Sequence, residues 1–331
     1  MKPLHVGLLA EPAAPTDTAR RMTDLGPPGD EDDAAWDVEV VSDSFTTGFE
    51  DVESALARLR ESARQRNWDL AIGLTELPLR DDDGRYLLAK ADPERQVAVL
   101  SLPALGGVRP HARARLAVRE LVSGMLGPME DERRAPLPLR GGRWRLLRGM
   151  VLANRPWLLV PGLKSALVAA LATGAITTIN STVWLLAGSL SWWRLAVATV
   201  VSIALVVGWL VIDGELWDRP GNDSAEARER SRLYNTSTLV TLTIGVLICY
   251  LALYVVNLAW ALFVLDPAVM GGFLQAPRDY GDLFVLTWFV ASAATVGGAL
   301  GSGLESDEAI RAAAYSKREE ERRNQLAWNR P

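Results

Sequence analysis

The chain has 331 residues, a mean hydropathy of +0.09 and a formal net charge of −5, and these averages hide two different halves. Residues 1–132 carry 15 Lys and Arg against 25 Asp and Glu, whereas residues 133–331 carry 20 against 15. An acidic first part and a basic, apolar second part predict a soluble domain joined to a membrane domain. The single cysteine, Cys249, excludes an intrachain disulfide and a cysteine-rich metal site. Separately, we expect no nucleic-acid partner.

The first 130 residues alternate between strand-like and helix-like patterns. Short apolar or alternating runs predict strands at 4–9, 36–41, 68–74, 86–88 and 96–102. Helical spacing predicts helices at 16–25, 49–67 and 110–126, the first of them capped by Thr16 or Asp17. This order predicts an α/β domain over 1–130, in two or three layers with a mixed sheet. The first apolar run is too short for a signal peptide, so we expect this domain in the cytoplasm.

An arginine-rich and proline-rich segment over 131–160 is predicted to be a juxtamembrane linker. Arginines just before an apolar run indicate the cytoplasmic side of a membrane and can meet anionic lipid headgroups. The residues predicted to contact headgroups are Arg140, Arg143, Arg145 and Arg148. The alternative is a solvated linker without a specific partner.

Four apolar runs follow, at about 163–187, 191–212, 237–265 and 283–303. Each has about 20 residues or more, which is enough to cross a hydrocarbon core of about 30 Å as a helix. We therefore predict an all-α transmembrane domain of four helices over 161–304, followed by a charged cytoplasmic tail over 305–331. The lipid bilayer is the expected environment of these helices.

The charges between the apolar runs predict the orientation. The 213–236 segment carries four arginines and the tail carries six basic residues, whereas the 266–282 segment carries only Arg278. Basic segments stay in the cytoplasm, so the N- and C-termini are predicted to be cytoplasmic, in a multi-pass protein of the plasma (inner) membrane.

Residue patterns that would carry catalysis are scarce. The two histidines, His5 and His111, have no metal-binding spacing, and none of the common phosphate-loop, dinucleotide, zinc-protease or nucleophile-elbow motifs is present. The acidic runs at 31–33 and 81–83 could attract divalent cations, but neither follows the EF-hand spacing, so solvated turns are favoured. We predict no cofactor, no metal site and no enzyme.

Part of the first domain resembles the archaemetzincin-type zinc proteases. The segments are AIGLTELPLR (71–80), VAVLSLPALGG (97–107) and AVRELVSGMLG (117–127), in the order of two strands and then a helix that carries H-E-x-x-H in that family. Here Arg119, Glu120 and Ser123 take the motif's positions, so both helix histidines are missing while the acid remains. The resemblance implies a degenerate, inactive zincin-like domain, and a chance match over about 55 residues is the alternative.

A second resemblance lies in the apolar half. The stretches YNTSTLVTLTIGVLICYLALYVVNL (234–258) and ATVGGALGSGLESDEAIRAAAYSKR (294–318) resemble a group of uncharacterised actinobacterial multi-pass membrane proteins. The resemblance implies a plasma-membrane location and supplies no activity.

Polar residues recur along two of the predicted spans. The first span carries Thr173, Thr177 and Asn180 on one predicted helical face, and the third carries Thr243, Tyr250, Tyr254 and Asn257. Such residues can line a hydrated path, or they can join helices by hydrogen bonds of about 1 kcal/mol or less each. No Asp, Glu, Lys or His lies near the centre of a span, which argues against proton-coupled transport more than against a passive pore.

The fourth span contains a G-x-x-x-G motif at Gly297 and Gly301, which permits close helix packing within a protomer or between protomers. Together these features favour a homo-oligomeric channel or passive transport protein regulated by its cytoplasmic domain. The alternative is a non-catalytic sensor or scaffold that binds an unidentified cytoplasmic ligand or partner through the α/β domain. A membrane-anchored enzyme ranks last.

Overall fold

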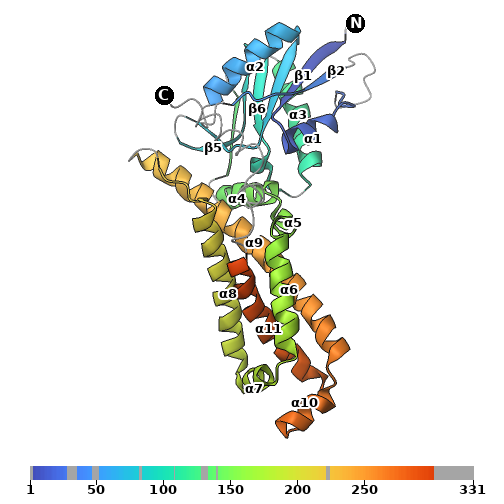
Figure 1. Cartoon of the computed structure of the whole chain (residues 1–331). Helices are drawn as coiled ribbons and strands as arrows, with labels where there is room; N and C mark the ends of the chain where they lie inside the picture. Colours follow the sequence, from blue (N-terminus) through green and yellow to red (C-terminus); the bar gives the residue numbers. More distant parts are fainter. Residues whose placement is uncertain are drawn as a thin grey trace. The chain divides into compact units, whose positions relative to one another are not determined.

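The computed structural model describes residues 3–27, 36–46, 52–81, 84–107, 109–127, 133–138, 141–220 and 224–301 (Figure 1). The chain forms two compact units, the first within residues 1–153 and the second within 154–315. The first is a mixed α/β sheet domain and the second consists of helices, which confirms the predicted fold class.

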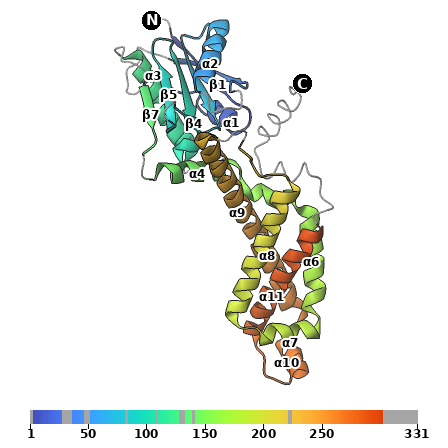
Figure 2. The same ribbon diagram turned by 90° about the vertical axis from the view of Figure 1, so that its left-hand side faces the viewer.

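The first unit is built on a seven-stranded sheet. Its strands are β1 (Leu4–Ala10), β2 (Trp36–Ser42), β3 (Leu70–Thr75), β4 (Leu79–Arg80), β5 (Tyr86–Asp92), β6 (Val97–Ser101) and β7 (Arg133–Pro136). The order is β2-β1-β3-β6-β5-β4, with β7 paired to β5 off this path. β2, β1, β3 and β6 are parallel, and β5 is antiparallel to β6, β4 and β7. Figure 2 shows β7 beside β5 at this antiparallel side of the sheet.

Helices cover both faces of the sheet, so the domain has three layers (Figure 1). The helices are α1 (Ala14–Arg20), α2 (Val52–Arg66), the 3₁₀ turn η1 (Pro103–Leu105), α3 (Pro110–Leu126) and α4 (Gly142–Ala153). One core cluster joins α1 and α3 to one face, and a second joins α2 to the other. The central strands β3 and β6 are buried along their whole length, because parallel strands between two helical layers have no solvent face.

Most predicted elements of this domain agree with the structure, and α3 has the predicted bounds. The predicted cap of the first helix is wrong. α1 begins at Ala14, before Thr16, and its N-cap residue Ala13 makes no side-chain hydrogen bond. The Thr16 hydroxyl instead donates to the Glu11 carbonyl at 2.8 Å, because α1 packs down on the end of β1. The 131–160 segment, predicted as a linker, contains β7 and α4.

The second unit contains two short turns and six helices among its described residues. They are η2 (Pro156–Leu158), α5 (Leu159–Gly162), α6 (Lys164–Thr178), α7 (Ser181–Ser189), α8 (Trp192–Asp213), α9 (Ala225–Val264), α10 (Pro267–Leu274) and α11 (Tyr280–Gly301). Three helices, α8, α9 and α11, are long and apolar enough to cross a membrane. A fourth span is counted if the stretch Gly142–Gly162 and the helix Lys164–Thr178, bent by 54°, are taken together.

The prediction of one continuous helix over 163–187 is wrong. α6 ends at Thr178 and α7 begins at Ser181, with Asn180 between them in an extended conformation (φ −87°, ψ 118°). The Asn180 side chain accepts a hydrogen bond from the Thr182 backbone N–H at 2.9 Å. Asparagine favours such N-cap positions because its side chain satisfies an amide that the new helix leaves unpaired. The apolar run therefore turns at Asn180.

The third predicted helix begins earlier than expected, at Ala225 instead of 237. The Ser224 hydroxyl caps it by accepting from the Ala227 N–H at 3.1 Å. At 40 residues, α9 is about 60 Å long, roughly twice the thickness of a hydrocarbon core. Asn235, in the third turn of α9, joins this helix to the segment after α8. Its side chain donates to the Asp218 carbonyl at 2.9 Å and accepts from the Asp218 N–H at 2.8 Å.

Candidate functional site

A cluster of hydroxyl groups joins three helices of the second unit. The side-chain oxygens of Thr199 on α8, Tyr250 on α9 and Ser292 on α11 lie 3.1 Å from one another, each within hydrogen-bond distance of the other two. Tyr250 and Ser292 are buried. The three oxygens can satisfy one another because every hydroxyl both donates and accepts.

Two further side chains extend this cluster. The Trp288 indole N–H donates to the Thr199 oxygen at 2.7 Å, and the Ser202 hydroxyl lies 2.9 Å from the Ser292 carbonyl oxygen. Only Tyr250 belonged to the predicted face. Thr199 and Ser202 are three residues apart on α8, and Trp288 and Ser292 are four apart on α11. Their helical spacing was a signal that could have identified them.

Asn257, also on the predicted face of α9, is 1% exposed and lies against α6. It donates to the Leu253 carbonyl at 2.9 Å. A Cβ added at Gly174 would lie 2.2 Å from the Asn257 Oδ1 atom, so the absence of a side chain at Gly174 makes room for the amide. This amide is part of a close helix contact.

Of the polar residues predicted for one face of the first span, Thr173 and Thr177 lie one turn apart on α6, whereas Asn180 lies outside this helix. Thr173 donates to the Ala169 carbonyl at 2.9 Å, and Thr177 donates to the Thr173 carbonyl in the same way. Asn180 lies in the break after α6, so its predicted place on a continuous helical face is wrong. Such bonds to the preceding turn occupy threonine hydroxyls without any partner helix.

The remaining predicted residues of α9 differ in exposure. Thr243 is exposed and Tyr254 is half-buried, whereas Tyr250 and Asn257 are buried. The predicted polar face of α9 is therefore divided between the interior of the helical unit and its surface.

Gly298 of α11 packs closely against α6 within the protomer. A Cβ at Gly298 would lie 2.8 Å from the Ala166 carbonyl oxygen and 2.9 Å from the Ala170 Cβ, both on α6. At Gly297 the nearest atom, Thr173 Cγ2, is 3.6 Å away. The closest approach therefore falls on Gly298, a residue beside the predicted G-x-x-x-G pair. Gly301 is the last residue of α11 that the structure describes, and the contacts predicted for it lie outside the described part of the chain.

In the α/β unit, Glu11 follows β1 and is buried. Its carboxylate accepts hydrogen bonds from the Thr46 hydroxyl, from the Thr75 hydroxyl at 2.5 Å and from the Glu76 N–H at 3.3 Å. The strand order reverses between β1 and β3, and open α/β sheets commonly bind ligands outside the carboxyl ends of strands at such a point. Here Glu11 ties the ends of β1 and β3 to the segment after β2.

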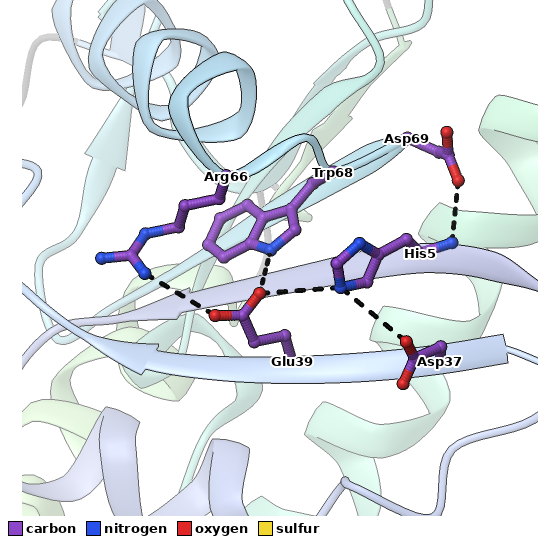
Figure 3. A network of polar contacts seen from close by, with 6 residues as sticks. All are labelled: His5, Asp37, Glu39, Arg66, Trp68 and Asp69. Atoms are coloured by element: carbon purple, nitrogen blue, oxygen red, sulfur yellow. Dashed lines mark hydrogen bonds and ion pairs between the residues drawn. The ribbon is translucent and has the colours of Figure 1, made fainter.

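A second polar network lies toward the opposite ends of the same strands (Figure 3). The Glu39 carboxylate accepts from the Trp68 indole N–H at 2.6 Å, and it lies 3.6 Å from both the Arg66 guanidinium and the His5 Nε2 atom. His5 Nε2 is also 3.9 Å from Asp37. The Arg66 guanidinium lies over the Trp68 ring, 5.7 Å from its centroid, so this network fixes the indole and the end of α2.

An open cleft of about 580 Å³ lies beside this network, between the last turns of α2 and the β5–β6 turn. Its lining includes Arg60, Arg64, Asn67, Asp69, Glu94 and Arg95. Arg95 pairs with Asp92 at 3.3 Å, whereas no ion pair is found for Arg60 or Arg64 among the described residues. Charges of both signs make the cleft suited to a polar ligand.

The positions of the zinc-protease resemblance lie on α3. Arg119 donates to the Gly26 carbonyl at 3.1 Å, Glu120 is exposed and Ser123 is half-buried. Within the described ranges, no group of three or more His, Cys, Asp or Glu could hold a metal ion. The acidic run 31–33 and two residues of the run 81–83 lie outside those ranges.

His111 lies half-buried in the first turn of α3, beside α1. Its Nδ1 atom is 3.2 Å from the Thr18 hydroxyl. Partial burial, together with the nearby Arg21 cation, lowers the pKa of His111 below its usual range.

The predicted headgroup residues differ in their surroundings. Arg143 and Arg148 are exposed on α4, and Arg145 is half-buried. Arg140 lies outside the described residues.

No protein-family model, no curated protein and no solved structure matches the chain.

Proposed function

We propose that this chain is an integral membrane protein whose packed helical unit anchors an α/β domain that binds a polar ligand or a partner. The observation that carries the proposal is the cluster of Thr199, Tyr250 and Ser292. Polar side chains that could have lined a path are hydrogen-bonded to one another between helices. Interhelical hydrogen bonds of this kind hold membrane helices together.

The contacts of the other polar residues support the same assignment. Asn257 packs against Gly174, and the hydroxyls of Thr173 and Thr177 bond to their own helix. A hydrated path needs groups that face water and can exchange hydrogen bonds with a passing solute. The Asn257 amide and the threonine hydroxyls already have hydrogen-bond partners within the helical unit, which favours an anchor over a channel.

Binding is assigned to the α/β domain because it holds a polar, open cleft. The cleft is about 580 Å³, within the usual size of small-molecule sites, and Arg64 and Asn67 lie at its exposed margin. A ligand or a peptide segment with both donors and acceptors suits its mixed charges.

The charge distribution supports an orientation with both termini in the cytoplasm. Arginines gather in the segment between α8 and the apolar part of α9. The segment before α11 carries only Arg278, which pairs with Asp282 at 2.9 Å. Basic segments remain on the cytoplasmic side, which is the basis for proposing a plasma-membrane protein of this orientation.

A homo-oligomeric channel regulated by its cytoplasmic domain is the second candidate. It is favoured by the exposure of Thr173 and Thr243, because these threonines lie at the surface of the helical unit and would need neighbouring copies to enclose a path.

Purified protein in liposomes separates the two candidates. With a fluorescent readout of ion and small-solute flux, we expect no flux above protein-free liposomes, and imaging in nanodiscs should show no axial path between protomers. Flux that is lost in Thr243→Leu, in a variant of unchanged thermal stability, would support the channel and overturn the anchor.

Ligand binding is tested by the thermal stability of the full chain in nanodiscs against a panel of polar metabolites and short peptides. A ligand that binds the folded state raises the unfolding temperature by mass action. The rise should disappear in Arg64→Gln and persist in Arg58→Gln, because Arg58 is exposed on the same helix but does not line the cleft. Equal effects of the two variants would place binding elsewhere.

A further inference from the structure

The helix α4 has two faces of opposite character, and its inner face is fixed to the α/β core. Leu146 is fully buried and Met150 is 7% exposed. A Cβ at Gly149 would lie only 1.9 Å from the Pro103 carbonyl oxygen, so the helix backbone touches η1 directly. Because α4 is packed against this unit, it belongs to the α/β domain.

The outer face of α4 is basic and aromatic. Trp144 is 71% exposed, and Arg148, one turn further on, is exposed beside it, whereas Arg143 is exposed in the first turn on another side of the helix. Trp144 and Arg148 lie four residues apart, which places them on one side of the helix, whereas Leu152, 38% exposed, packs on Gly107. No acidic residue occurs anywhere from 133 to 212, so this face lies within a long stretch of purely basic charge.

Arg145 differs from its neighbours although the sequence gives them the same pattern. Its Nε atom is buried and has no hydrogen-bond partner among the residues that the structure describes, and its Cγ atom lies 2.7 Å from where a Cβ at Gly106 would be. Its stem therefore packs along Gly106, which glycine permits. The structure separates this arginine from the exposed pair Arg143 and Arg148.

Only a short segment connects α4 to the first apolar helix. Ten residues, 154–163, lie between the end of α4 and the start of α6. Even fully extended, they would span only about 35 Å. They also include Trp157, which is 50% exposed and, like Trp144, belongs to the residue type enriched at membrane interfaces.

We propose that the outer face of α4 lies on anionic lipid headgroups, with Trp144 at the interface and with Arg148 contacting phosphates. The proposal rests on the proposed function, because it requires that the helical unit be inserted in a bilayer. It commits to a lipid surface because the face is basic, aromatic and tethered next to a candidate span. An arginine and a tryptophan side by side match the charge and the polarity gradient of a headgroup layer.

The test uses the full chain in nanodiscs, in a Cys249→Ala background, with one nitroxide label per variant. Labels replace Trp144 on α4, Leu116 on the exposed side of α3 and Val200 in the middle of α8, all exposed side chains. Electron paramagnetic resonance measures the access of oxygen and of a water-soluble nickel chelate. Discs contain either phosphatidylcholine alone or a mixture with phosphatidylglycerol.

We expect the label at 144 to lose nickel access in the anionic discs and to regain it in phosphatidylcholine discs and in Arg148→Gln. The Arg145→Gln variant is the matched control and should leave the label at 144 shielded, with an unchanged unfolding temperature showing that α4 remains packed.

Three results would overturn the inference or its basis. If the label at 144 is as open to nickel as the label at 116 while that at 200 is buried in lipid, α4 does not lie on headgroups although the chain is inserted. Equal release by Arg145→Gln and Arg148→Gln would refute the assigned face. If the label at 200 is open to nickel, the proposed membrane function itself fails.

Discussion

Replacing Gly298 by alanine tests whether α11 packs on α6 at the residue that the structure indicates. The added Cβ would lie 2.8 Å from the Ala166 carbonyl oxygen and 2.9 Å from the Ala170 Cβ, whereas ordinary contacts begin near 3.4 Å. One of these atoms is backbone and the other is a Cβ, so neither can turn away. The two helices must therefore separate.

The cost follows from the size of that separation. Opening the contact by about 0.5 Å forfeits about a quarter of the dispersion energy of each atom pair that it separates. Overpacking of this kind typically costs about 1–3 kcal/mol. Alanine also returns up to about 1 kcal/mol of helix propensity. We expect Gly298→Ala to lower the free energy of unfolding of the helical unit by about 1–2 kcal/mol net.

Gly297→Ala is the matched control, because it lies one residue away on the same helix and gains the same propensity. Its nearest contact would be an ordinary 3.6 Å to Thr173, so the variant should be as stable as the parent or up to about 1 kcal/mol more stable. Reversible unfolding of the detergent-solubilised protein in sodium dodecyl sulfate gives both values. If Gly297→Ala is the more damaging change, the register of α11 against α6 is refuted.

Three further predictions concern other contacts. Tyr250→Phe removes one hydroxyl of the interhelical cluster and should cost about 0.5–1 kcal/mol in the same unfolding titration, and no loss would mean that the cluster contributes nothing. Gly149→Ala, which drives a Cβ into the Pro103 carbonyl, should cost about 1–3 kcal/mol or more in the α/β unit by hydrogen exchange, whereas Gly208→Ala, in open space on α8, should be harmless. The lowered pKa of His111 means that the unfolded state binds a proton at this residue first as the pH falls, so the stability that neutral His111 contributes is fully present above about pH 6.5 and is lost as the pH falls below it. His111→Gln should flatten that part of the thermal midpoint against pH, and an unchanged slope would refute the assignment.

Local patterns in the sequence were sufficient for the coarse fold. The spacing of Ala114, Val118, Val122 and Met125 predicted α3 with its bounds and its buried face, because helical periodicity is a property of neighbouring residues. The apolar runs likewise indicated the candidate spans. The break at Asn180 was missed because an asparagine in an apolar run is compatible with either a polar face or a cap, and only the backbone conformation distinguishes them.

The candidate sites depended on contacts that no local pattern contains. Arg145 and Arg148 look alike in sequence, and they differ because Gly106, far away in the chain, gives room to only one of them. The Glu11 carboxylate acquires its role from Thr46 and Thr75, which the sheet topology brings to the end of β1.

The sequence by itself determined which segments are apolar, the bounds of α3, and that an acidic α/β part precedes a basic helical one. The tertiary structure alone decided that Tyr250 meets Thr199 and Ser292, and that Gly298 is the closest point between α11 and α6. The physical reason is that periodicity and charge act between near neighbours, whereas hydrogen bonding and packing between helices depend on their relative rotation and register. A rotation by one residue about the axis of α11 would move Gly298 out of the contact and bring Gly297 into its place, without changing the composition of the helix.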